Sequence, residues 1–186
     1  MANANTVITL DGVHAAIMDA IRDQFRAFNL VEAYLSDRRP PVVPACLIEL
    51  VDFETTADAM DPGTEQLAVT ARFAARLLIS FREVPNSRME IRKLAAAFCA
   101  WLRLRRFGQP IGPAQVLGAY PDDFEQELDQ YECWRVEWTN VLHLGNTIWT
   151  DDGIMLEPVY SWAPDIGIGH EDDYKPLDEL TGHDLL

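Results

Sequence analysis

The sequence has few cysteines, and their spacing excludes the usual roles of paired thiols. Its 186 residues include three, Cys46, Cys99 and Cys133. An odd and widely spaced set does not form a disulfide framework, and a structural zinc site needs pairs such as Cys-x-x-Cys. All three lie among apolar neighbours. We therefore expect small, buried side chains that carry no chemistry of their own.

No apolar run reaches the length of a membrane span, which needs about 20 residues. The longest candidate, Leu94 to Leu104, is interrupted by Arg103. The first residues, Met1 to Thr6, have neither the basic region nor the apolar core of a signal peptide. The expectation is a protein without a membrane partner that folds in the cytoplasm of the cell that makes it.

Recognisable catalytic motifs are also missing from the sequence. There is no Gly-x-Ser-x-Gly motif, no phosphate-binding loop and no dinucleotide-binding fingerprint. No two of the four histidines stand at metal-ligand spacing. The sequence therefore predicts no catalytic residue and no cofactor, and a protein that is not an enzyme.

One acidic cluster, Gly169-His170-Glu171-Asp172-Asp173-Tyr174, could offer oxygen ligands to a divalent cation. Adjacent side chains of an extended segment point in opposite directions, so few of these could reach one ion. We predict no metal site here. The alternative hypothesis is a metal-dependent enzyme that uses Asp172 and Asp173.

Basic residues are scarce in the last two-fifths of the chain. Residues 1–110 contain 13 acidic and 13 basic residues, whereas residues 111–186 contain 17 acidic residues and only Arg135 and Lys175 as basic ones. Such an acidic surface repels phosphate backbones and disfavours specific nucleic-acid binding. Alternatively, the excess charge only keeps an exposed tail in solution.

Two segments have the periodicity of amphipathic helices. Apolar residues recur at three- and four-residue steps from Leu10 to Phe28 and again from Ile91 to Leu102. The spacing of Ser87 and Glu90 predicts a capping box at the start of the second helix, and Gly108 predicts its end at about Phe107. Arg103, Arg105 and Arg106 would then lie in its last turn. They are candidate interface residues, or they simply complement the helix dipole.

Five segments predict strands: 30–35, 45–53, 67–81, 115–120 and 131–144. Trp134, Val136 and Trp138 alternate with Arg135 and with polar neighbours, as in a strand with one buried face. The turn residues between 55 and 66 predict a long antiparallel hairpin. Together these elements predict an α+β fold (an α/β sandwich), with a small mixed or largely antiparallel sheet and two main helices on one face.

From Thr147 onward, aromatic residues and prolines recur without a period. We therefore predict a core domain at residues 1–146 and an extended, acidic, aromatic-rich C-terminal arm at 147–186, ordered by packing on another surface. Its candidate interface residues are Trp149, Tyr160, Trp162 and Tyr174.

The order of several short sequence segments resembles the tail-terminator (tail-completion) proteins of Mu-like, contractile-tailed phages. The resemblance extends from about Val13 to Tyr174. It rests on these segments: Ala15-Ala16-Ile17, Tyr34, Pro40-Pro41-Val42-Val43-Pro44-Ala45, Leu47-Ile48-Glu49-Leu50, Ile91-Arg92-Lys93-Leu94-Ala95-Ala96, Tyr131-Glu132-Cys133-Trp134-Arg135-Val136-Glu137-Trp138, Leu144-Gly145, Trp149 and Gly169-His170-Glu171-Asp172-Asp173-Tyr174.

The resemblance implies an α/β protein that acts by assembly. A homo-oligomeric, hexameric ring would cap the head-proximal end of the tail tube, end tube polymerisation and bind the head-side connector or neck protein. The implied partners are further copies of the chain, the tail tube protein and that connector, and genome DNA would pass through without specific binding. The implied location is the tail of the virion, after assembly in the host cytoplasm. Another head-tail joining, neck or minor tail protein is the nearest alternative.

Overall fold

The structure is a computed structural model that describes residues 7–34, 42–55, 63–122, 131–148 and 159–176. These residues fall into two compact units, a core unit of residues 7–148 and a C-terminal unit of residues 159–176.

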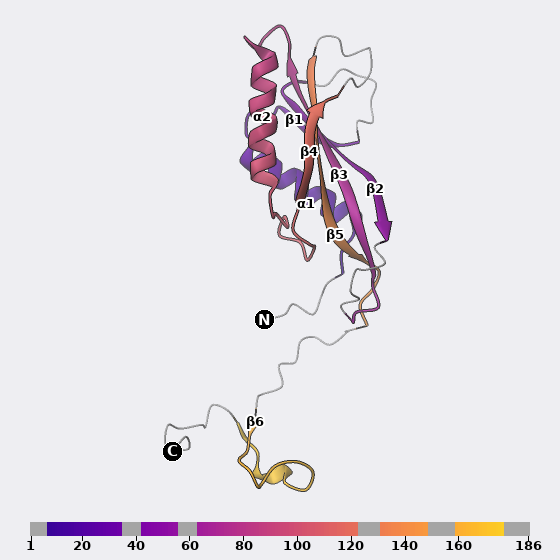
Figure 1. Cartoon of the computed structure of the whole chain (residues 1–186), viewed down its shortest axis with the longest axis vertical. Coiled ribbons are helices and arrows are strands. Elements are labelled where there is room, and N and C mark those ends of the chain that lie inside the picture. Colours follow the sequence, from indigo (N-terminus) through magenta and orange to yellow (C-terminus); the bar gives the residue numbers. More distant parts are fainter. Residues whose placement is uncertain (1–6, 35–41, 56–62, 123–130, 149–158, 177–186) are drawn as a thin grey trace, which may run out of the picture. The chain divides into compact units, whose positions relative to one another are not determined.

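The core unit is a five-stranded sheet with two helices (Figure 1). Its strand order is β1-β2-β3-β5-β4. β1 pairs with β2 in parallel, and all other pairs are antiparallel. The predicted α+β fold with a mixed, largely antiparallel sheet is therefore confirmed. The elements are α1 (Leu10–Gln24), β1 (Leu30–Ala33), β2 (Ala45–Thr55), β3 (Leu67–Ser80), α2 (Ser87–Leu102), β4 (Gln115–Pro121) and β5 (Tyr131–Leu144).

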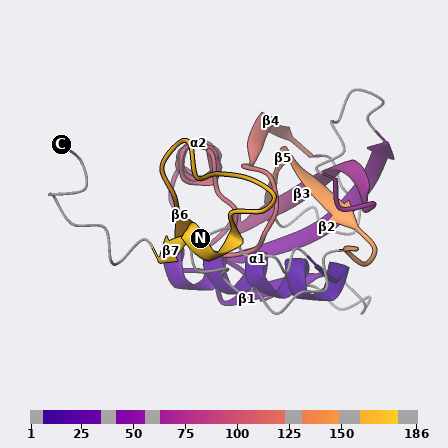
Figure 2. The same ribbon diagram turned by 90° about the horizontal axis from the view of Figure 1, so that it is seen from below.

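One face of the sheet is apolar, and both helices pack on it (Figure 2). The alternation along β3 and β5 places Phe73 and Trp138 on this face, and both are fully buried. Their rings stack with centroids 5.7 Å apart, and Phe98 of α2 packs on Trp138 at 6.5 Å. Val13, Ile17 and Ile21 of α1 fill the same core, as their helical spacing requires.

α1 ends at Gln24, four residues before the predicted end at Phe28. Its start is fixed by Thr9, whose hydroxyl accepts a hydrogen bond from the Gly12 amide at 3.1 Å. The chain then turns, because the Asn29 amide donates to the Pro44 carbonyl at 2.8 Å and brings the chain beside β2. Phe25 still reaches the core, where it stacks on Phe98 at 5.2 Å.

α2 differs from the prediction at both ends. Asn86, in a left-handed conformation with φ of 55°, caps the helix without a side-chain hydrogen bond, and Ser87 is the first helical residue. The predicted capping box is therefore wrong. The helix ends at Leu102, since Arg103 leaves the helical conformation, with φ of −50° and ψ of 123°, and the Leu104 amide donates to the Ala114 carbonyl at 2.9 Å. That long-range pairing, ahead of β4, overrides the local signal that pointed to Phe107.

Among the described residues, no helix combines the length and the apolar character that crossing a membrane requires.

We expect truncation of Phe98 to destabilise the core unit strongly. Phe98→Ala leaves a cavity between α2 and Trp138, and such changes cost about 3–5 kcal/mol. Met89→Ala, on the same helix but 48% exposed, should cost far less. Urea unfolding followed by circular dichroism measures both. Equal, small losses would show that the assigned faces of α2 are wrong.

Candidate interaction surfaces

The sheet face opposite the helices carries a ladder of alternating charges. Arg76 of β3 forms two ion pairs. Its Nη1 lies 2.6 Å from Oε2 of Glu49 on β2, and its Nε lies 2.9 Å from Oδ2 of Asp122, just after β4. Arg135 of β5 binds the other oxygen of Glu49 at 3.1 Å and Glu137 at 2.7 Å. We call these five residues the ion ladder.

The register of the strands explains why the ladder is needed. Arg76 and Arg135 stand directly opposite each other on β3 and β5. Like charges at such a position destabilise a sheet, and the carboxylate of Glu49 lies between them and neutralises the repulsion. The side chains of Arg76 and Arg135 are only 13% and 16% exposed, so their charges depend on these partners more than on water.

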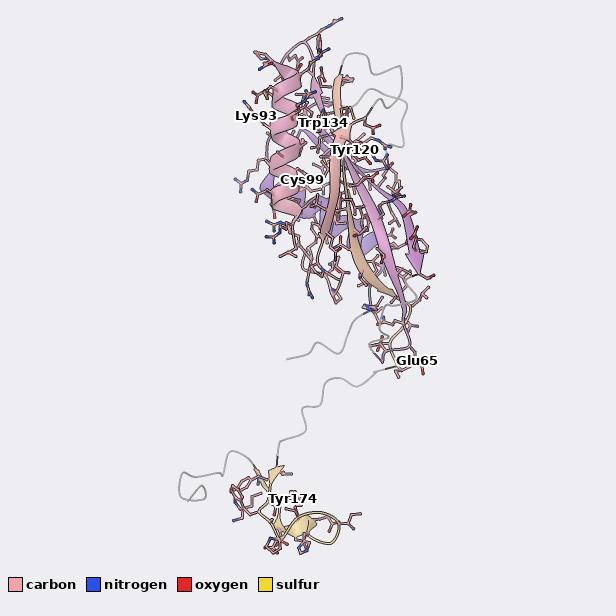
Figure 3. All side chains as sticks on the ribbon, viewed as in Figure 1. Glu65, Lys93, Cys99, Tyr120, Trp134 and Tyr174 are labelled. Carbon is pink, nitrogen blue, oxygen red and sulfur yellow. The ribbon has the colours of Figure 1, made fainter. Side chains whose placement is uncertain are left out.

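Glu137 ends the ladder and is ionised more readily than an ordinary glutamate. Burial alone would raise its pKa, but hydrogen bonds from Tyr120 and Arg135 and the nearby charges of Arg135 and Arg72 outweigh that effect. The net result is a pKa below the ordinary value. Tyr120 lies on β4 (Figure 3), and Arg72 pairs in turn with Asp52 on β2.

Sequence reasoning placed Arg135 and Glu137 on the outward face but missed the ladder. Alternation along one strand gives the face of each residue, whereas the ladder depends on the register of β2, β3 and β5. The charged residues inside the apolar strand patterns, Glu49 and Arg76, were the available signal.

A second surface is the turn that follows α2, which holds the three predicted arginines. They lie beyond the helix, and the prediction that they occupy its last turn is wrong. Arg105 is held by its own chain, since its Nε donates to the Trp101 carbonyl at 2.7 Å and its guanidinium lies over the Trp101 ring at 4.5 Å. Arg103 and Arg106 are exposed, and neither forms an ion pair within the described part of the chain.

Asn140, which the sequence did not single out, fixes this turn to β5. It is buried, and its amide nitrogen donates to the Gly112 carbonyl at 2.8 Å and to the Arg105 carbonyl at 3.3 Å. Its oxygen accepts from the Trp138 indole at 2.9 Å. The turn is therefore tied to the centre of the core.

The C-terminal unit has regular structure of its own. β6 (Val159–Tyr160) pairs with β7 (Lys175–Pro176) in an antiparallel arrangement, and a short 3-10 helix, η2 (Glu171–Asp173), precedes β7. Tyr160 packs against Trp162 with ring centroids 6.3 Å apart. The prediction of an arm without local structure is thus wrong for residues 159–176.

The structure brings two of the four predicted aromatic residues of the arm together, Tyr160 and Trp162. Tyr174 (Figure 3) lies in the same unit, where its hydroxyl accepts a hydrogen bond from the Gly167 amide at 2.9 Å. Trp149 lies outside the described residues.

The acidic cluster is folded differently from the extended segment that the sequence suggested. Because of the 3-10 turn, His170 Nδ1 lies 3.0 Å from the carboxylate of Asp173. Potential ligand atoms of Asp165, His170 and Asp173 all lie within 4.8 Å of one another. The prediction that few side chains of this cluster could reach one ion is therefore wrong for His170 and Asp173. Asp172 is not one of the three converging residues.

The three cysteines are free thiols, and Cys46 is buried as predicted. Cys99 and Cys133 are only partly buried, so the prediction that all three are buried is wrong for these two. Burial raises the pKa of Cys133 to about 12, and it also raises the pKa of Cys46 and of Cys99. All three stay protonated at neutral pH, which makes them poor nucleophiles.

The ion ladder predicts a specific acid sensitivity. Because the folded-state pKa of Glu137 is below its ordinary value of 4.5, its carboxylate stabilises the fold above that value, and the contribution is lost as pH falls through the folded-state pKa. We expect Glu137→Gln to cost about 1–3 kcal/mol at neutral pH, and its difference from the native chain to shrink in acid.

Urea unfolding over a pH series measures this difference. Glu83→Gln is the control, since Glu83 is exposed and outside the ladder. A Glu137→Gln difference that is constant at every pH would show that the charge of Glu137 does not stabilise the fold.

Comparisons of the sequence with models of protein families and with curated proteins find no match, so the resemblance rests on the sequence segments themselves.

Proposed function

We propose that this chain is a structural protein of a contractile phage tail that assembles as a hexameric ring and caps the head-proximal end of the tail tube. The ring would end tube polymerisation and provide the surface for the head-side connector or neck protein. Three features support the proposal: the order of the segments that resemble tail terminators, the α+β core, and two segments of opposite charge.

The observation that carries the proposal is the opposition of charge between residues 87–107 and residues 147–186. The stretch from Ser87 to Phe107 contains six basic residues and a single acidic one, Glu90. Residues 147–186 contain ten acidic residues and a single basic one, Lys175. A protein with two different, complementary surfaces associates head to tail, and head-to-tail contacts close into rings when the rotation between copies permits.

The same charge distribution suits the passage of DNA. A ring whose opening is lined by acidic residues repels phosphate backbones, so that the genome moves through without binding. This part of the proposal concerns residues 111–186, where acidic residues exceed basic ones by 17 to 2.

Electron microscopy of the purified chain tests the proposal. We expect rings with a central opening, a mass of six subunits in solution, and rings at one end of tail tubes when tube protein is added. A particle that binds the portal or neck but never tubes would favour another head-tail joining protein. A chain that stays monomeric and binds neither would contradict assembly.

A shortened chain that ends at Ile148 separates folding from assembly. It keeps the whole apolar core and the hydrogen bond from the Ile148 amide to the Thr64 carbonyl at 3.2 Å. We expect its circular dichroism to match that of a folded α+β unit and its ring formation to be lost. Rings formed by the shortened chain would show that residues 149–186 are not the assembly element.

A further inference from the structure

The C-terminal unit presents one apolar side chain on a fixed loop. Ile168 is fully exposed, and it stands between Gly167 and Gly169, whose φ angles are 91° and 96°. Glycine adopts this left-handed conformation without steric cost. The loop is held on both sides of Ile168, since the Gly167 amide donates to the Tyr174 hydroxyl at 2.9 Å and the Gly169 amide to the Glu171 carboxylate at 3.1 Å.

Such a fixed loop is suited to binding. A side chain on a pre-organised backbone loses little conformational entropy when it is buried by a partner. Trp162 and Ile166 of the same unit are each 54% exposed, so the exposed apolar surface of the unit includes more than Ile168 alone. Asp165 and Asp172 add negative charge. We call residues 162–172 the acidic tip.

The turn after α2 presents an exposed apolar side chain and positive charge, which are complementary to the acidic tip. Leu104 is 59% exposed and has a φ of 64°, a conformation that is unfavourable for leucine and that its hydrogen bond to Ala114 maintains. The exposed guanidinium groups of Arg103 and Arg106 flank it, without an acidic partner in the described part of the chain. We call residues 103–106 the basic turn.

We infer that the acidic tip of one copy docks on the basic turn of the next copy, with Ile168 against Leu104 and the acidic side chains beside Arg103 and Arg106. The inference rests on the proposed ring, in which each subunit gives one surface and receives the other. The apolar pair would supply the contact, and the charges around it would fix its orientation and exclude the pairing of two tips or two turns.

Two variants test the docking. The turn variant carries Arg103→Glu and Arg106→Glu and keeps an intact tip. The tip variant carries Ile168→Asp and keeps an intact turn. All three positions are exposed, so we expect the circular dichroism and the thermal midpoint to remain those of the native chain. Leu117→Ser, at an apolar residue of β4 that is 56% exposed, is the control.

Sedimentation velocity of each variant, and of their equimolar mixture, gives the result. We expect the native chain and Leu117→Ser to form rings and each variant alone to lose them. The mixture should form dimers, because the tip of the turn variant can still bind the turn of the tip variant.

The remaining outcomes separate a failure of the docking from a failure of the proposed ring. If the native chain forms rings and both variants do so as well, the docking is wrong and the proposed function stands. A mixture that shows no more association than its components would also overturn the docking between copies. If the native chain itself is monomeric, the proposed ring fails, and the docking with it.

Discussion

Phe73, Trp138 and Phe98 pack together at the centre of the core unit, and their contact determines where the helices lie. Two of these rings come from the central strands and one from α2, and all three are fully buried. Their burial requires α2 to lie along β3 and β5, and the apolar stripe of α1 fills the remaining part of the same face. Both helices are thereby committed to one side of the sheet (Figures 1 and 2).

Among the described residues, both helices lie on that apolar face, and the opposite face carries the ion ladder. The ion ladder brings five charged side chains of this face into contact. The side chains of its two arginines, Arg76 and Arg135, are mostly buried. Buried or half-buried charges are costly when one partner is missing, so the ladder favours the one register in which every member is paired. We interpret the ladder as a device that fixes the register of β2, β3 and β5.

Sequence reasoning succeeded where the information was local. The bounds of β5, Tyr131–Leu144, were predicted correctly, since alternation persists over the whole strand. The apolar stripe of α2, from Ile91 to Leu102, was predicted from its helical periodicity. The C-terminal ends of both helices were predicted wrongly, because they depend on contacts with residues elsewhere in the sequence: Asn29 with Pro44, and Leu104 with Ala114.

For the candidate interaction residues, too, local sequence information was sufficient only where no contact with a distant residue was involved. Composition pointed to the arginines after α2 and to the aromatic residues of the arm. It could not show that Arg105 is bound to Trp101, which leaves Arg103 and Arg106 as the exposed pair. Nor could it show the fixed loop around Ile168, because that loop depends on two glycines with positive φ and on hydrogen bonds to Tyr174 and Glu171.

We propose that complementary charges, basic in residues 87–107 and acidic in residues 147–186, drive association between copies. Exposed charges are screened over about 10 Å at an ionic strength of about 0.1 M and over about 3 Å at 1 M. The most direct measurement is therefore the mass of the intact chain by sedimentation equilibrium, from low to high salt. We expect a discrete multi-subunit particle at low salt that dissociates as the salt concentration rises. A chain that is monomeric at every salt concentration would contradict it.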